Sequence, residues 1–114
     1  MLTVAALKEY GADTGEGLNR CMNNEAFYLR LVKMVEQDTH LDQLEKSLAE
    51  KNLDAAFENA HALKGVLANL ALTPALKPVS EMTELLRART DTDYSELMAS
   101  AHTEMDRLLE IIRN

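Results

Sequence analysis

The chain has 114 residues, of which 46% are hydrophobic and 4% aromatic, and 19 Asp and Glu against 12 Lys and Arg give a formal net charge of −7. This length suits one hydrophobic core, so we predict a single domain over residues 1–114. An acidic chain without a basic cluster is poorly matched to nucleic-acid phosphates or to an anionic membrane surface, so we expect neither as a partner. Abundant Ala, Leu, Met and Glu favour helices over strands.

The N-terminal segment MLTVAALKEYGADTGEG lacks the basic start and long apolar run of a secretory signal, and no apolar stretch approaches the roughly 18 residues of a membrane-spanning helix. The single cysteine, Cys21, has no partner for an intramolecular disulfide. It lies among helix-forming residues, as is typical of a small buried residue in a reducing compartment. We therefore expect a cytoplasmic protein, and we expect it to be a monomer.

Two short helices, about 2–10 and 14–22, are predicted first, on either side of a glycine-containing turn. Three amphipathic helices follow, over about 24–37, from a cap at Thr39 to about 51, and over 53–72. In the first of these the predicted buried stripe is Phe27, Leu31, Met34 and Val35. Thr73-Pro74 then interrupts the chain, and Pro78 blurs the start of a further helix that reaches about Arg89. A polar turn at 90–93 precedes the last helix.

The connections between these helices are short, which makes successive helices run antiparallel. Each longer helix carries one apolar stripe, and such stripes are buried together in a shared core. The predicted fold is therefore all-α: an antiparallel up-and-down four-helix bundle with additional short N-terminal helices.

The stretch AHALKG, residues 60–65, stands near the middle of the helix predicted over 53–72. At about 100° per residue, the apolar residues gather on the side opposite His61, and this predicted buried face consists of Ala56, Ala60, Leu63, Val66, Leu67 and Leu70. His61 is therefore expected to be exposed. Its neighbours on the outer face are expected to be Asp54, Phe57, Glu58, Lys64, Gly65, Ala68 and Leu72. The apolar members of this set, around a reactive side chain, suggest a docking surface for a partner.

Gly65 and Lys64 complement this histidine chemically. A glycine inside a helix costs about 1 kcal/mol relative to alanine, so we expect a gain from the missing Cβ, namely room for a bulky group or another protein's backbone. Lys64, one turn from His61, is close enough to reach an anion held on the imidazole. A nucleophilic nitrogen, a nearby cation and free space together suit a histidine that becomes phosphorylated.

The segment AHALKG with its continuation VLANLAL resembles the signature of histidine-containing phosphotransfer (HPt) domains, and the upstream GLNRCMNNEAFYLRLVKMV is similar to the N-terminal segment of that family. The resemblance spans nearly the whole chain. It implies a four-helix bundle in which His61 is the phosphoacceptor and Lys64 and Gly65 assist it. It also implies that receiver domains are the partners, that the receiver supplies Mg²⁺, and that this chain is a phosphoryl carrier without independent catalytic machinery or a cofactor of its own.

Three residues depart from the family pattern or disturb it. Leu67 stands where many members have a small residue, Ala71 where many have glycine, and Pro78 is a candidate helix breaker. Two other functions stay open: a module that binds receivers without transfer, and the phosphoacceptor segment of a chemotaxis-type histidine kinase. No phosphate-binding glycine loop or dense metal-ligand cluster is evident, so no metal site is expected.

Overall fold

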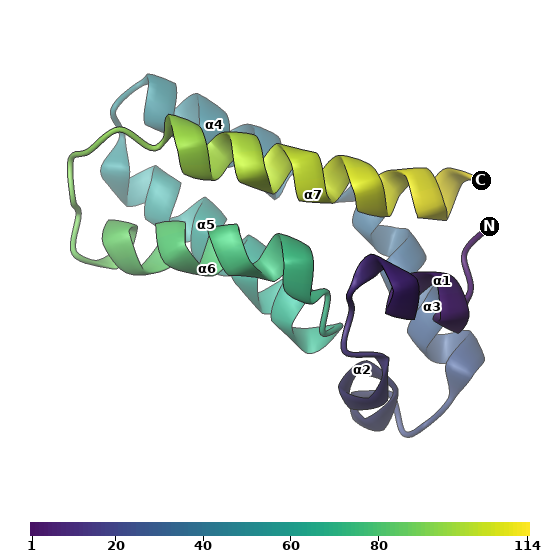
Figure 1. Ribbon diagram of the computed structural model, residues 1–114. Helices are drawn as coiled ribbons and strands as arrows, with labels where there is room; N and C mark the ends of the chain where they lie inside the picture. The colour runs from purple at the N-terminus through teal and green to yellow at the C-terminus, as the bar shows by residue number, and fades with distance from the viewer.

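The computed structural model describes residues 1–114 and consists of helices joined by short turns, without strands. Figure 1 shows their arrangement. In chain order the elements are α1 (Val4–Tyr10), α2 (Thr14–Arg20), α3 (Glu25–Met34), the 3₁₀ helix η1 (Val35–Gln37), α4 (His40–Ala49), α5 (Leu53–Asn69), α6 (Thr73–Arg87) and α7 (Ser95–Arg113). The predicted all-α fold class is confirmed.

Helices α4 to α7 form the bundle. Helix α4 packs on α5, α5 on α6, and α6 on α7, and consecutive helices alternate in direction (Figure 1). The turns at 50–52 and 70–72 are short, which favours an antiparallel return of the next helix. The buried side chains of all these helices and of the N-terminal segment join in one core, whose largest fully buried members include Tyr28, Leu7, Leu44, Leu63, Leu67, Leu72, Met82, Leu86 and Leu108.

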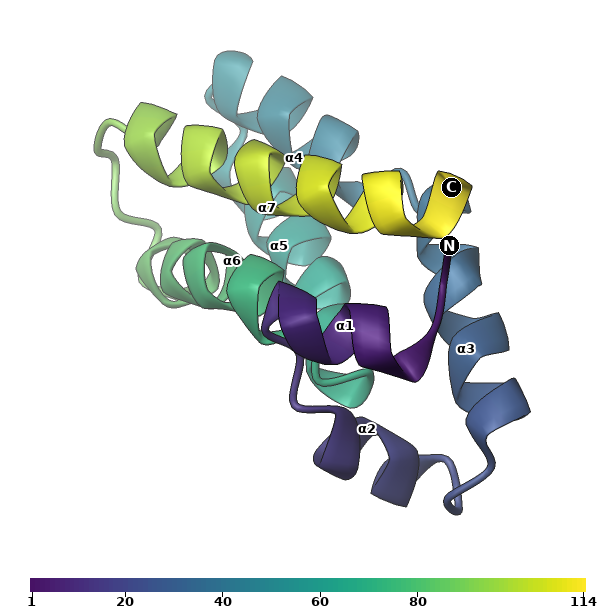
Figure 2. The same ribbon diagram turned by 45° about the vertical axis from the view of Figure 1, so that its right-hand side comes forward.

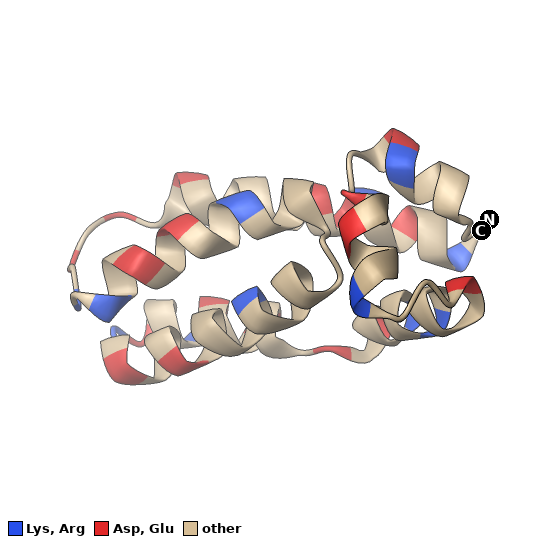
Figure 3. Cartoon of the chain, turned by 90° about the horizontal axis from the view of Figure 1, so that it is seen from below, with Lys and Arg blue, Asp and Glu red and all other residues tan.

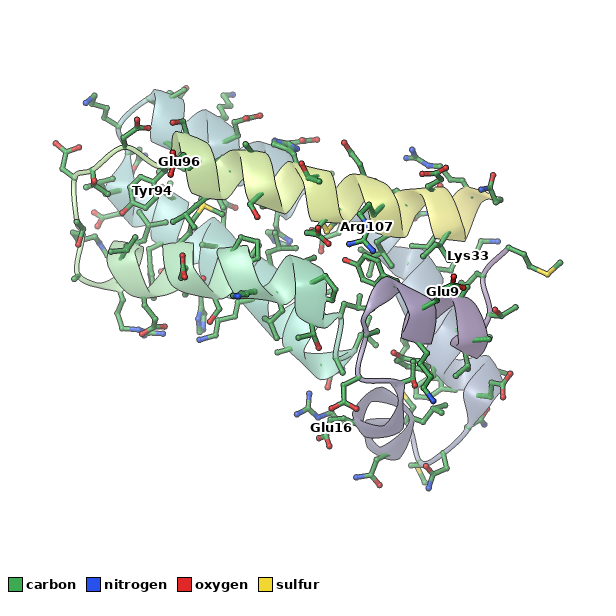
Figure 4. The ribbon with its side chains drawn as sticks, viewed as in Figure 1. Glu9, Glu16, Lys33, Tyr94, Glu96 and Arg107 are labelled. Carbon is green, nitrogen blue, oxygen red and sulfur yellow. The ribbon has the colours of Figure 1, made fainter.

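The N-terminal helices cover one end of the bundle, near the C-terminus of α7 (Figure 2). Two hydrogen bonds tie this segment to the α5–α6 connection: the Asp13 amide donates to the Ala71 carbonyl at 3.0 Å, and the Tyr28 hydroxyl donates to the Leu70 carbonyl at 2.9 Å. On α7, Arg107, which is labelled in Figure 4, donates to the Tyr10 carbonyl at 3.2 Å and lies over the Tyr10 ring. The N-terminal segment is thus docked where α5 ends and α6 begins.

Helix α3 and η1 bury a face that coincides with the predicted one at Val35 and, in part, at the half-buried Leu31, but not at Phe27 and Met34. Tyr28, Val32 and Val35 are buried, whereas Phe27 is 37% exposed and Met34 is 62% exposed. Both sets of residues recur at helical spacing, so the pattern along α3 allows two registers. The observed register is the one that lets Tyr28 pack against Gly17, where an added Cβ would lie 2.6 Å from the Tyr28 ring.

Helix α5 ends at Asn69, three residues before the predicted end near Leu72. Ala71 takes a left-handed conformation with φ 55°, its amide donates to the Ala68 carbonyl, and the Leu72 amide donates to the Leu67 carbonyl. This is the Schellman arrangement that closes a helix C-terminus. The position usually carries glycine, because a Cβ strains the left-handed conformation. Because residue 71 is alanine and not glycine, the sequence did not indicate that α5 ends here.

Helix α6 runs through Pro78 without a break, so the expected interruption there is wrong. Pro74 lies in the first turn, where a missing amide hydrogen is tolerated. Pro78 lies one turn further on and is buried in the core, so its ring removes only the hydrogen bond to the carbonyl four residues earlier while adding apolar contact. The start of the helix at Thr73 is therefore well defined.

Acidic and basic residues are interspersed along the helices (Figure 3). None of the helices is both long and apolar enough to cross a membrane.

Candidate functional site

The site is built on the outer face of α5. The Asn52 side chain begins the helix by accepting a hydrogen bond from the Ala55 amide at 3.1 Å. The core side of the helix buries Ala56, Ala60, Leu63 and Leu67. His61 is exposed, as the helical geometry predicted. Burial of one stripe therefore fixes the orientation of α5 and leaves the imidazole facing solvent.

The His61 ring lies on an aromatic neighbour. The centroids of the His61 and Phe57 rings are 5.5 Å apart and the ring planes differ by 18°, which is a stacked arrangement. Two guanidinium groups lie over the Phe57 ring, Arg87 at 5.1 Å and Arg89 at 4.8 Å from its centroid. Arg89 also donates to Asp54 at 2.7 Å. Phe57 is half-buried, because its ring packs partly against the core and also lies under the two guanidinium groups. The stack on Phe57 restricts the orientation of the imidazole.

Lys64 lies one turn along α5 from His61 and is held by a residue of the neighbouring helix. Its Nζ is 3.3 Å from a carboxylate oxygen of Glu84 on α6. Arg87 donates to the same carboxylate at 3.3 and 3.5 Å. These donors, Arg87 first and then Lys64, lower the pKa of Glu84. Glu84 therefore stays ionised and links Lys64 of α5 to Arg87 of α6.

Gly65 faces open space. A Cβ built on its backbone would meet no atom within 4 Å apart from the local helix. Packing within the domain therefore does not require glycine at position 65. Glycine also weakens the helix, so neither packing nor helix stability accounts for its presence. The space that it leaves is on the solvent side, beside Lys64 and one turn from His61.

Most of the chain matches a known protein family. Residues 31–113, most of the chain, match the family model described as Hpt domain. The chain belongs to the Hpt family. Hpt domains take part in histidine phosphotransfer in two-component signalling. No curated protein and no solved structure matches the chain. The family match begins at Leu31, so α1, α2 and most of α3 lie outside it, whereas the resemblance noted in the sequence reached further upstream.

Not every residue predicted for the docking surface is exposed in this Hpt domain. Asp54 and Glu58 are exposed, and Phe57 and Ala68 are half-buried. The Ala68 carbonyl accepts a hydrogen bond from Arg20 of α2. Leu72 is wrongly placed by the prediction: it is fully buried, because α5 has already ended and Leu72 leads into α6. Leu72 is therefore a core residue.

Leu67 and Ala71, which depart from the family pattern, are both accommodated in the interior of the domain. Leu67 is fully buried on the core side of α5, opposite the exposed face that carries His61. Ala71 is buried in the turn that closes α5. Neither side chain reaches the surface around the imidazole.

Sequence reasoning missed the residues that other elements bring to the site. Glu84, Arg87 and Arg89 lie on α6 or just after it, more than a dozen residues from the histidine motif. No local pattern marks them, because the packing of α5 on α6 alone brings them close. A groove lined by Leu31, Met34, Val35, Gln37, Asp38, Val66, Asn69 and Leu70 was missed as well, since it depends on the register of α3.

The remaining histidines have local partners. His40 lies 2.9 Å from Asp38, and His102 lies 3.3 Å from Glu45 across the α4–α7 contact. No group of three or more His, Cys, Asp or Glu side chains is arranged to hold a metal ion. His61 is thus distinguished from the other two by its aromatic stack and its open surroundings.

Proposed function

We propose that His61 accepts a phosphoryl group from the aspartate of one receiver domain and passes it to the aspartate of another, as a carrier in a multistep phosphorelay. The observation that supports this most directly is an exposed imidazole, stacked on Phe57, with Lys64 and the open side of Gly65 one turn away. A core histidine would be enclosed and hydrogen-bonded. His61, in contrast, is exposed and therefore accessible to a partner.

In the forward step a lone pair on the unprotonated nitrogen of the neutral imidazole attacks phosphorus. An N–P bond forms while the P–O bond to the receiver carboxylate breaks, and its electron pair leaves on that carboxylate. The proton on the other ring nitrogen stays in place. Lys64 offsets the phosphoryl charge, and the receiver supplies Mg²⁺ and the remaining groups, so the Hpt domain needs no catalytic machinery or cofactor of its own.

The docking surface is the outer face of α5, with Asp54, Phe57, Glu58 and Ala68 around His61. Gly65 gives the receiver backbone room to approach the imidazole. We propose that residues 1–114 act as one monomeric unit in the cytoplasm, with receiver domains of response regulators or hybrid kinases as partners. Neither nucleic acid nor a membrane is part of this function.

The test is incubation with a receiver domain that carries labelled phosphoaspartate. The expected result is label on this chain that survives base and is lost in acid, as a phosphoramidate bond requires. The chain has three histidines, so His40→Gln and His102→Gln are matched controls that keep the label, whereas His61→Gln loses it. Label uptake by His61→Gln equal to that of the parent would refute the assignment.

The same proteins separate transfer from binding. If the chain only binds receivers, His61→Ala binds a receiver as tightly as the parent and neither protein is labelled. If it is the phosphoacceptor segment of a chemotaxis-type kinase, an ATP-bound kinase domain labels it faster than any phosphorylated receiver does. Rapid exchange with receivers in both directions is the outcome that supports the relay.

A further inference from the structure

Glu84 is the one acidic side chain that the structure pairs with Lys64. Its carboxylate lies between Lys64, at 3.3 Å, and Arg87, also at 3.3 Å. Glu84 and Arg87 are a turn apart on α6, whereas Lys64 comes from α5. The pairing thus crosses the α5–α6 contact and depends on the tertiary structure.

A chain of contacts returns from this carboxylate to the imidazole. Arg87 lies over the Phe57 ring at 5.1 Å, and Phe57 stacks on His61 at 5.5 Å. Lys64 in turn stands three residues after His61 on the same helix, a spacing that places their side chains side by side. The cation expected to meet a phosphoryl group is therefore occupied by a carboxylate before that group arrives.

A phosphoryl group on His61 changes the balance of charge at Lys64. It carries a charge of about −1.5 to −2 near neutral pH and presents three strong acceptor oxygens, whereas a carboxylate carries a single charge. Lys64 has a long and flexible side chain with three donors, which lets it turn from one anion to the other. Arg87 stays bonded to Glu84, so the carboxylate does not lose its whole compensating charge when Lys64 leaves.

We propose that Glu84 is a positioning residue that holds Lys64 while His61 is unphosphorylated and releases it to the phosphoryl group afterwards. Glu84 thereby competes with phosphohistidine for Lys64 and lowers the stability of the phosphorylated state. This keeps the N–P bond reactive enough for onward transfer. The inference rests on the proposed function, since it concerns the phosphorylated form of the same histidine.

The test uses a phosphodonor too small to depend on docking. Phosphoramidate reacts with the imidazole so that a new N–P bond forms, the donor's own P–N bond breaks and ammonia leaves. At a fixed ratio of phosphoramidate to ammonia, the fraction of phosphohistidine measured by ³¹P NMR reports the stability of the bond on the protein. Glu84→Gln should raise the ratio of phosphorylated to free protein by about 1.4-fold to fivefold, the range for one exposed ion pair.

Glu81→Gln is the matched control, because Glu81 is an exposed glutamate one turn earlier on α6 and forms no ion pair. It removes the same charge and should leave the ratio close to the parent's. In a Lys64→Ala background the effect of Glu84→Gln should fall to that of Glu81→Gln. Raising the salt to about 1 M, where the Debye length is about 3 Å, should shrink the difference between the two variants.

Three other results would contradict the role of Glu84, and one of them would also contradict the proposed function. Equal phosphorylation of Glu84→Gln and Glu81→Gln, with the parent phosphorylated at His61, would overturn this inference and leave the proposed function standing. A decrease in Glu84→Gln would overturn it too, because Glu84 would then prepare Lys64 for the phosphoryl group. A parent chain that acquires no phosphohistidine from either phosphoramidate or receivers would overturn the proposed function and this inference with it.

Discussion

Gly65 offers a test in which stability and function are expected to change in opposite directions. Gly65→Ala should stabilise the domain by about 1 kcal/mol, the difference between the two residues in a helix interior. The new Cβ meets no atom within 4 Å outside the local helix, so neither a clash nor a packing gain alters that figure. For a domain of this size, 1 kcal/mol corresponds to a rise in melting temperature of about 4 °C.

Gly65→Gln should keep most of this stabilisation, because glutamine is also a good helix former. Its longer side chain would fill the space beside Lys64 that we assign to an approaching receiver. Transfer from a phosphorylated receiver should fall by about 10-fold to 100-fold, the scale of a small misplacement of reacting groups. Phosphorylation by phosphoramidate, which needs no docking, should change far less.

The assays are thermal unfolding followed by circular dichroism and receiver transfer followed by label. Ala99→Gln is the control, since Ala99 is an exposed small residue on α7, a helix that carries none of the site residues. Unimpaired receiver transfer in Gly65→Gln would refute the clearance hypothesis. A loss of stability in Gly65→Ala would contradict the open space beside the glycine.

Three further variants test the site and the fold. Lys64→Ala should slow phosphorylation of His61 yet shift the unfolding free energy by less than about 1 kcal/mol, because its ion pair is exposed; a large loss of stability with normal transfer would contradict this role. Lys51→Gly should stabilise the chain by about 1 kcal/mol in urea unfolding, because Lys51 is exposed with φ 55° at the end of α4. Lys46→Gly, inside α4, should destabilise it by about as much, and the same sign for both would refute the explanation. Burial raises the pKa of Tyr28 from its ordinary 10.0 to about 12, so the folded state keeps a proton that the unfolded state loses, and stability falls as the pH rises across that window. Tyr28→Phe should flatten this fall in alkaline unfolding, and an unchanged slope would contradict it.

The periodicity of apolar residues predicted the existence and type of every longer helix. It also predicted the exposure of His61, because the buried residues of α5 are numerous enough to fix which side faces the core. The short spacing within AHALKG placed Lys64 and Gly65 beside the histidine for the same reason: helical geometry relates residues three and four positions apart. These features are local, so the sequence contains them directly.

The errors arose where a second element decides the outcome. Along α3, a stripe of apolar residues at helical spacing can begin at Phe27 or at Tyr28. Packing of Tyr28 against Gly17 selects the stripe that begins at Tyr28. Leu72 was assigned to the exposed face because Ala71 closes α5 without the usual glycine. Both errors concern the choice between local conformations of similar energy, which long-range contacts decide.

What the sequence determined by itself is the helical class, the antiparallel order of the bundle and the outward direction of His61, because these follow from periodicity and short connections. Only the tertiary structure decided which side chains of other elements lie near that histidine. Glu84, Arg87 and Arg89 reach Lys64 and Phe57 across the α5–α6 contact. Side chains distant in sequence meet only when two helices pack at a given angle and register, and a one-dimensional pattern does not contain that relation.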